Sequence, residues 1–146
     1  MPKSQALANS LLALVYNATP IANVADQAAA SPITNIYVSL HTGNLTAATG
    51  TQSDLETAYT NYVRVAVART TGGWVAPSAG VISNTALVQF AQCGVTGATI
   101  THVATGKVAT GSAGIAYHYG ALNAPLAVAN LIQPQFAANA LQIQES

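Results

Sequence analysis

The sequence predicts a mainly β protein: an antiparallel β-sandwich or jelly-roll-like barrel with one N-terminal helix and an extended arm. Three observations support this class. Apolar and polar residues alternate in most segments after residue 33, which is the period of a half-buried strand. Turn-forming residues recur roughly every eight to twelve positions, as they do in sandwiches and barrels. Only the first segment has a helical period, and no strand–helix–strand rhythm follows it.

The first segment, "KSQALANSLLALVYN" (residues 3–17), is expected to form a helix. Its apolar residues recur three or four positions apart, at Leu7, Leu11, Leu14 and Val15. Ser4 is the expected N-cap, and Pro20 ends the segment. Ile21–Pro32 has no clear period and is read as a surface arm. The predicted organisation is therefore a helix and arm over 1–32 and a β-sandwich domain over 33–146.

The strand pattern begins with "ITNIYVSLHT" (33–42), in which alternate side chains point to opposite faces. A polar loop (43–58) follows, and "YTNYVRVAVART" (59–70) is the next strand. Shorter runs predict further strands at 74–75, 81–84, 86–93, 98–106, 113–122, 124–130, 131–136 and 139–144. Seven to nine strands are expected at roughly this spacing.

The charge content is unusually low. Charged residues make up 5% of the 146 residues and the formal net charge is zero, whereas about 25% is ordinary for a soluble domain. Uncharged polar side chains are far less costly to desolvate than charged ones. The composition therefore favours a subunit that is covered by neighbours and associates with itself over a free enzyme.

The same composition argues against two classes of partner. The four cations are scattered along the chain, so no basic patch for nucleic acid is expected. The apolar run Leu11–Tyr16 is too short to span a membrane. The single cysteine, Cys93, is read as a small buried hydrophobic residue.

Acid–base chemistry has few candidates. Between Thr57 and Gln144 there is no Asp or Glu. Asp54 and Glu56 are too close in sequence to flank a sugar from opposite sides, and they are read as a solvated loop turn. A Ser-His-Asp triad would need its acid from Asp26 or Asp54 and has no supporting motif.

The histidines also give no clear site. His41, His102 and His118 each fall in a predicted strand without the short spacing of metal ligands. They are read as surface or interface residues, with His41 closing its strand. We therefore expect no catalytic, cofactor-binding or metal-binding residues and no cofactor. Three aromatic residues have the chemistry to stack on a sugar, although core or interface positions suit them better: Trp74, Tyr117 and Tyr119.

The order of the segments carries a resemblance. The chain runs through "ANSLLALVYN", "NIYVSLHTG", a Gly/Thr loop, "YVRVAVARTTGGW", "GVISNTALVQFAQ", "ATITHVATG" and "GIAYHYGALNAPLAV". This order resembles a family of small tailed-bacteriophage virion proteins often labelled phage tail fibre proteins. The closest pieces are Tyr37–Thr42, Tyr62–Val67, Thr101–His102 and Tyr119–Leu122. The family's aromatic and aspartate positions near 103–112 are absent from this chain.

The resemblance implies a non-enzymatic virion structural protein, assembled in the host cytoplasm. Because the chain has neither a coiled-coil pattern nor a repeat, we expect a capsid cement or decoration subunit that contacts the major capsid protein or other virion proteins. By analogy with decoration proteins, which commonly sit at three-fold positions, the expected oligomer is a homotrimer. The alternative is a tail fibre or tail-tip module that binds host surface glycan through exposed aromatic residues. A cell-wall hydrolase carried by the particle is a third hypothesis, which would rest on the histidines with Asp54 or Glu56.

Overall fold

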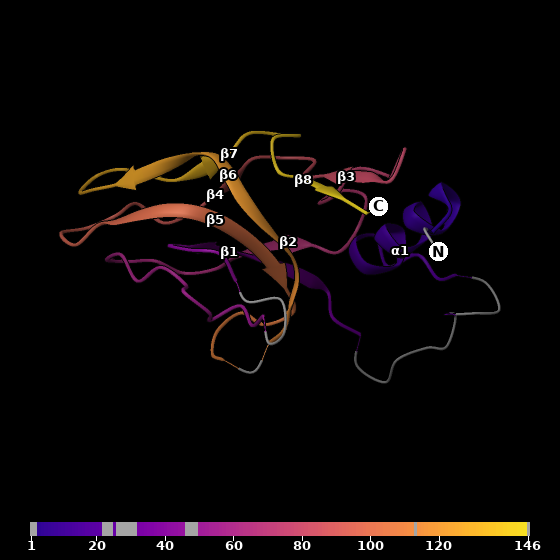
Figure 1. Ribbon diagram of the computed structural model, residues 1–146, viewed down its shortest axis with the longest axis horizontal. Helices are drawn as coiled ribbons and strands as arrows, with labels where there is room; N and C mark the ends of the chain where they lie inside the picture. The colour runs from indigo at the N-terminus through magenta and orange to yellow at the C-terminus, as the bar shows by residue number, and fades with distance from the viewer. Residues whose placement is uncertain (1–2, 22–24, 26–31, 46–49, 113, 146) are drawn as a thin grey trace. The chain divides into compact units, whose positions relative to one another are not determined.

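The computed structural model describes residues 3–21, 25, 32–45, 50–112 and 114–145. Within these residues lie one helix, α1 (Gln5–Tyr16), and eight strands (Figure 1). The strands are β1 (Asn35–His41), β2 (Val65–Ala68), β3 (Val81–Ser83), β4 (Val88–Gln89), β5 (Ala98–Gly106), β6 (Ala116–Val128), β7 (Gln135–Phe136) and β8 (Gln142–Gln144). The prediction of a mainly β class with one N-terminal helix is confirmed.

Contacts divide the chain into two compact units. Unit 1 comprises Met1–Asn35, Val67–Val88 and Phe136–Ser146, and unit 2 comprises Ile36–Ala66 and Gln89–Gln135. The predicted division at residue 32 stays a prediction. Most of the predicted arm, residues 22–24 and 26–31, lies outside the described residues.

The largest sheet has four strands in the order β2-β1-β5-β6, and two-stranded sheets pair β3 with β8 and β4 with β7. β1 runs antiparallel to β5, and β5 runs antiparallel to β6. None of these sheets, over the residues described, closes into a barrel. In unit 2 the apolar residues Ile36, Val38 and Leu40 of β1 are buried, as are Ile100 of β5 and Phe90, which follows β4.

β6 is a long edge strand that contains a bulge. The sequence predicts a break near residue 123, and the structure has a single strand whose pairing shifts there. Ile100 pairs with Leu126 and His102 with Ala121, so that Thr101 stands against Leu122–Pro125. Proline has no N–H for a sheet ladder and is tolerated at bulges and edges. The predicted break between two strands therefore coincides with the bulge, but β6 is one strand that continues on both sides of it.

In unit 1, the most buried residues of α1 are not those that give the segment its helical period. Its buried residues are Ala8, Leu12 and Tyr16, spaced four apart, whereas Leu7 is 44% exposed. The cause is an aromatic contact, because the Tyr16 ring packs edge-on against Trp74 with centroids 4.7 Å apart.

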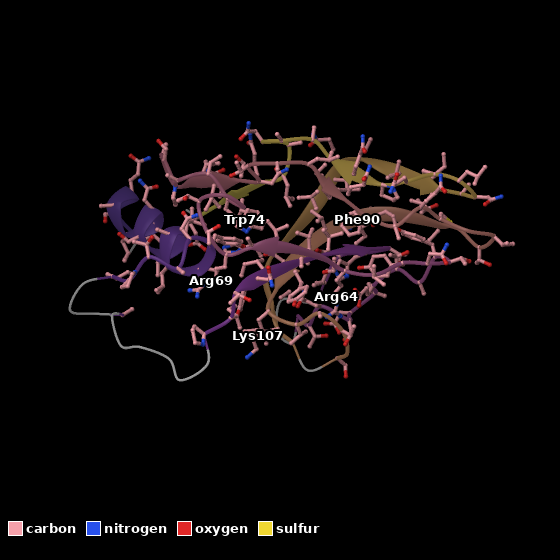
Figure 2. The ribbon with its side chains drawn as sticks, turned by 180° about the vertical axis from the view of Figure 1, so that it is seen from behind. Arg64, Arg69, Trp74, Phe90 and Lys107 are labelled. Atoms are coloured by element: carbon pink, nitrogen blue, oxygen red, sulfur yellow. The ribbon has the colours of Figure 1, made fainter. Side chains whose placement is uncertain are left out.

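Both ends of α1 have polar partners. The Ser4 side chain accepts a hydrogen bond from the Leu7 N–H at 3.2 Å, as predicted for an N-cap. At the other end the Arg69 guanidinium donates to the carbonyl oxygens of Leu14 and Val15 (Figure 2). A cation at this end satisfies free carbonyls and opposes the negative end of the helix dipole.

Candidate functional site

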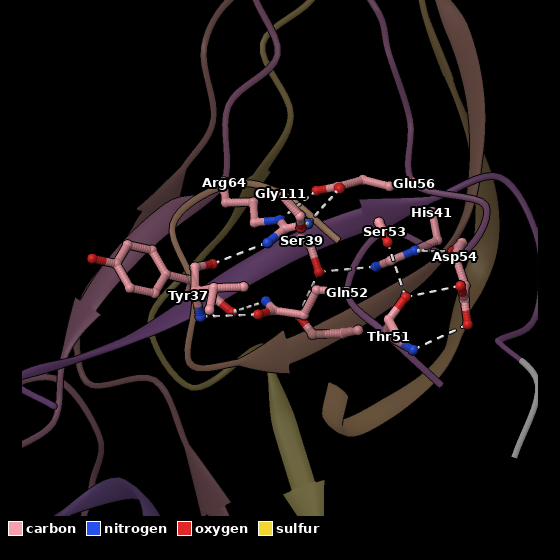
Figure 3. Close-up of polar contacts among 12 residues, drawn as sticks. Tyr37, Ser39, His41, Thr51, Gln52, Ser53, Asp54, Glu56, Arg64 and Gly111 are labelled. Carbon is pink, nitrogen blue, oxygen red and sulfur yellow. Dashed lines mark hydrogen bonds and ion pairs between the residues drawn. The ribbon is translucent and has the colours of Figure 1, made fainter. Parts of the chain in front are cut away.

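β1 is buried on both faces, which the alternation in its sequence does not reveal. Its apolar residues face one side, and Ser39 and His41 alternate with them, yet both of these polar residues are 0% exposed. The prediction of a surface or interface histidine is therefore wrong for His41. That His41 ends a strand is confirmed. A buried serine beside a buried histidine has the residue types of a catalytic pair (Figure 3).

The His41 ring uses both nitrogens inside unit 2. Its Nδ1 donates to the main-chain carbonyl of Asp54 at 2.8 Å, and its Nε2 lies 2.9 Å from the Ser39 Oγ. With Nδ1–H donating, Nε2 accepts the hydrogen of the serine hydroxyl. Burial lowers the pKa of His41, which holds the ring neutral, as this pattern requires.

The Asp54 carboxylate does not complete a triad. Its two oxygens accept hydrogen bonds from the Thr51 N–H at 3.0 Å and the Thr51 hydroxyl at 2.8 Å. Those hydrogen bonds lower the pKa of Asp54. The histidine therefore meets only the peptide oxygen of this residue, and the carboxylate stabilises a tight turn.

Glu56 and Arg64 form a second group of polar contacts, next to that of His41. The two side chains make a two-pronged ion pair with both contacts at 2.7 Å, and the arginine side chain is 3% exposed. Glu56 also accepts the Tyr62 hydroxyl at 2.8 Å, and burial raises the pKa of that phenol. Arg64 donates further to the carbonyls of Val108 and Gly111, each at 3.0 Å. The expected solvated loop turn is therefore wrong for Glu56.

Gln52 joins the same region to β1 and to the loop that follows β5. Its Nε2 donates to the Tyr37 carbonyl at 3.0 Å, and its Oε1 accepts the Val108 N–H at 3.2 Å. The side chain is 0% exposed and passes over Gly106, where a Cβ would lie 2.3 Å from the Gln52 carboxamide. A side chain at position 106 would therefore displace this glutamine.

We call Ser39, His41, Thr51, Gln52, Asp54, Glu56 and Arg64 the polar cluster. His41, Gln52 and the Glu56–Arg64 pair join the segment 50–57 to β1 and to the loop 107–111 through hydrogen bonds. Main-chain bonds continue the pairing, since Thr57 N–H donates to the Leu40 carbonyl and Thr42 N–H to the Leu55 carbonyl, both at 2.9 Å. The polar cluster thus fixes the described part of the long loop to its own sheet.

The other two candidate histidines, His102 and His118, do not form a site with the polar cluster. His102 pairs directly with His41 across β1 and β5, and its Nδ1 lies 2.8 Å from the Thr101 hydroxyl. His118 pairs with Thr105 on the far side of β5. Within the described residues, no three His, Cys, Asp or Glu side chains gather as metal ligands. The same residues contain no helix long and apolar enough to cross a bilayer.

The aromatic candidates separate into core and surface. Trp74 is 0% exposed, so the hypothesis that it stacks on a sugar is wrong. Tyr119 is 38% exposed on β6. Cys93 is 1% exposed, as expected for a buried hydrophobic residue.

The His41 environment predicts a pH dependence of stability. Because its folded-state pKa is lowered from 6.5, the unfolded chain binds the proton more tightly. The contribution of His41 is complete above about pH 6.5 and is lost as the pH falls toward the folded-state pKa. Urea unfolding of the purified chain from pH 7.5 to 5 should show a falling free energy of unfolding.

Replacement of His102 and His118 by Gln gives the matched control for that titration. The decrease in the free energy of unfolding between pH 7.5 and 5 should remain in this double variant and disappear in His41→Gln. If the decrease disappears in the double variant instead, the assignment to His41 is contradicted.

Comparison with protein families adds the remaining observation. A family model described as podophage GP4 fiber I protein gp80 matches residues 3–144, which is nearly the whole chain. The chain belongs to this family. The predicted resemblance to phage tail fibre-type virion proteins is therefore confirmed. No curated protein matches the chain.

Proposed function

We propose that this chain is a non-enzymatic structural subunit of a phage particle and that it forms part of a fibre. Membership of a fibre-protein family over residues 3–144 supports the structural role. The observation that carries the non-enzymatic part is the burial of Ser39 and His41, each 0% exposed. A nucleophile and its base must reach a substrate within hydrogen-bonding distance. Here both side chains are engaged by other groups of unit 2.

A second candidate is a capsid cement or decoration subunit. It is favoured by the near absence of charge, since a surface of Ala, Thr, Ser and Asn suits broad contact with neighbouring capsid proteins. In either position we propose that the chain contacts copies of itself and other virion proteins, with a homotrimer as the expected oligomer. Neither nucleic acid nor membrane is a proposed partner.

The copy number in purified particles separates the two candidates. Quantitative mass spectrometry should give a small fraction of the major capsid protein for a fibre, because only a few fibres are attached to one tail. A copy number close to that of the major capsid protein would contradict the fibre position and support the decoration position.

A further inference from the structure

β6 lies at the edge of the largest sheet and pairs with β5 on one side. At its start, the Ala116 N–H donates to the Gly50 carbonyl at 2.9 Å, so the segment 50–52 accompanies β6 there. From Tyr119 to Val128, no second strand lies beside β6 in the part of the chain that the structure describes. Main-chain N–H and C=O groups on the outer side of such a strand can pair with a strand of another chain.

The side chains of this edge do not oppose such pairing. Residues 116–128 contain no Asp, Glu, Lys or Arg, whereas charged side chains are a common protection of edge strands. Tyr119 is 38% exposed and Leu126 37%, and Ala121 and Ala127 are exposed as well. A long, exposed and mainly apolar edge is a predicted site of aggregation. Protection of β6 therefore has to come from something other than charge.

The bulge of β6 interrupts this edge near its middle. Between the pair Ile100–Leu126 and the pair His102–Ala121, β5 advances by two residues and β6 by five, so β6 carries three extra residues. Within 119–128, three residues keep regular pairing with β5 on each side of the bulge. Three residues are the lower limit of ordinary strand length. A strand added at the outer side would therefore meet no uninterrupted ladder.

Pro125 strengthens the interruption. Proline has no N–H to donate to a further strand, and within sheets it is confined to edges and bulges. The bulge also buries little, because Asn123, Ala124 and Pro125 are exposed and Leu122 is half-buried. Packing in unit 2 therefore gives little reason for the three extra residues.

We infer that the bulge Leu122–Pro125 protects the edge of β6 against pairing with β6 of a second copy of this chain. A bulge with a proline does this by interrupting the ladder and increasing the local twist of the strand. Self-association is thereby confined to other surfaces, and copies do not grow into open-ended β aggregates. This role of the bulge does not depend on where the chain lies in the particle.

Deletion of Asn123–Pro125 removes the three extra residues and tests this role directly. Leu122 then falls opposite Thr101, and the ladder with β5 becomes continuous. The purified variant should fold, as judged by circular dichroism, and should form thioflavin T-positive aggregates at least about tenfold faster than the wild type at the same concentration. Adding Ala121→Lys to the deletion should return the rate to within about twofold of the wild type, because like charges on identical edges oppose their pairing.

Pro125→Thr keeps the length of the chain and gives a second, milder test. Threonine restores an N–H and favours strand, so this variant should aggregate about threefold faster or more. Pro77→Thr is the matched control, because Pro77 lies between β2 and β3, outside β6, and its replacement should leave the aggregation rate unchanged.

A folded deletion variant that aggregates at the wild-type rate would overturn the inference. Faster aggregation that Ala121→Lys does not reverse would overturn it as well, since pairing along the edge of β6 would then not be the cause. If the deletion variant does not fold, Pro125→Thr decides the matter, and an aggregation rate equal to that of the wild type overturns the inference.

Discussion

Arg64→Met should lower the free energy of unfolding of the purified chain by about 3–5 kcal/mol, because it removes one partner of a buried ion pair. The Arg64 side chain is 3% exposed, and its loss leaves the Glu56 carboxylate without a cation. The carbonyls of Val108 and Gly111 also lose their donor. Urea unfolding followed by circular dichroism measures the change.

Two further variants make the test of this pair specific. Glu56→Gln in the Arg64→Met background removes the stranded charge, so the double variant should be more stable than the sum of the two single changes predicts. Lys3→Met is the control, because the Lys3–Glu145 pair is more exposed, with side chains 28% and 23% accessible, and should contribute about 0–1 kcal/mol. Equal losses for Arg64→Met and Lys3→Met would contradict a special role for the buried pair.

Trp74→Ala should destabilise the chain by about 3–5 kcal/mol, the usual cost of removing a large aromatic side chain from a packed core. Trp74 is 0% exposed and contacts Tyr16 of α1 at a ring-centroid distance of 4.7 Å. The melting temperature should therefore fall sharply, with loss of the near-ultraviolet signal of the aromatic residues.

Tyr119→Ala is the comparison for the tryptophan variant, because Tyr119 is 38% exposed and its removal should change stability by about 0.5 kcal/mol or less. A Trp74→Ala protein as stable as the wild type would contradict the core position. Glycan binding that depended on Trp74 in a still-folded protein would contradict it too.

The sequence predicts individual strands better than it predicts which faces are buried. The bounds of β5, Ala98–Gly106, match the expected strand, and β1 lies within its expected segment. Alternation shows which side chains share a face, but it does not show that a second layer covers the polar face. For this reason the burial of Ser39 and His41 could not be read from β1 alone.

The polar cluster could not be predicted from the sequence for a related reason. Glu56 was expected in a solvated turn, and nothing in the sequence shows that it pairs with Arg64. Their contact depends on how the loop returns to β1, which is a tertiary feature. The short strands β4 and β7 have two residues each, because their predicted segments include turns that apolar composition does not distinguish from strand.

The position of α1 shows the same limit. The apolar period of Leu7, Leu11, Leu14 and Val15 predicts the helix, whereas the residues that the helix buries are Ala8, Leu12 and Tyr16. The contact between Tyr16 and Trp74 selects the buried residues, and it joins residues 58 positions apart. The apolar period within one segment carries no information about a contact with a residue so far away in the sequence.

The structural role in the particle is tested most directly by the composition of gradient-purified virions. We expect the chain to be present at a constant ratio to the major capsid protein across independent preparations, and to remain after washing with high salt. The near absence of charged residues leaves little for salt to screen. A chain that is abundant in infected cells but absent from infectious particles would contradict the structural role.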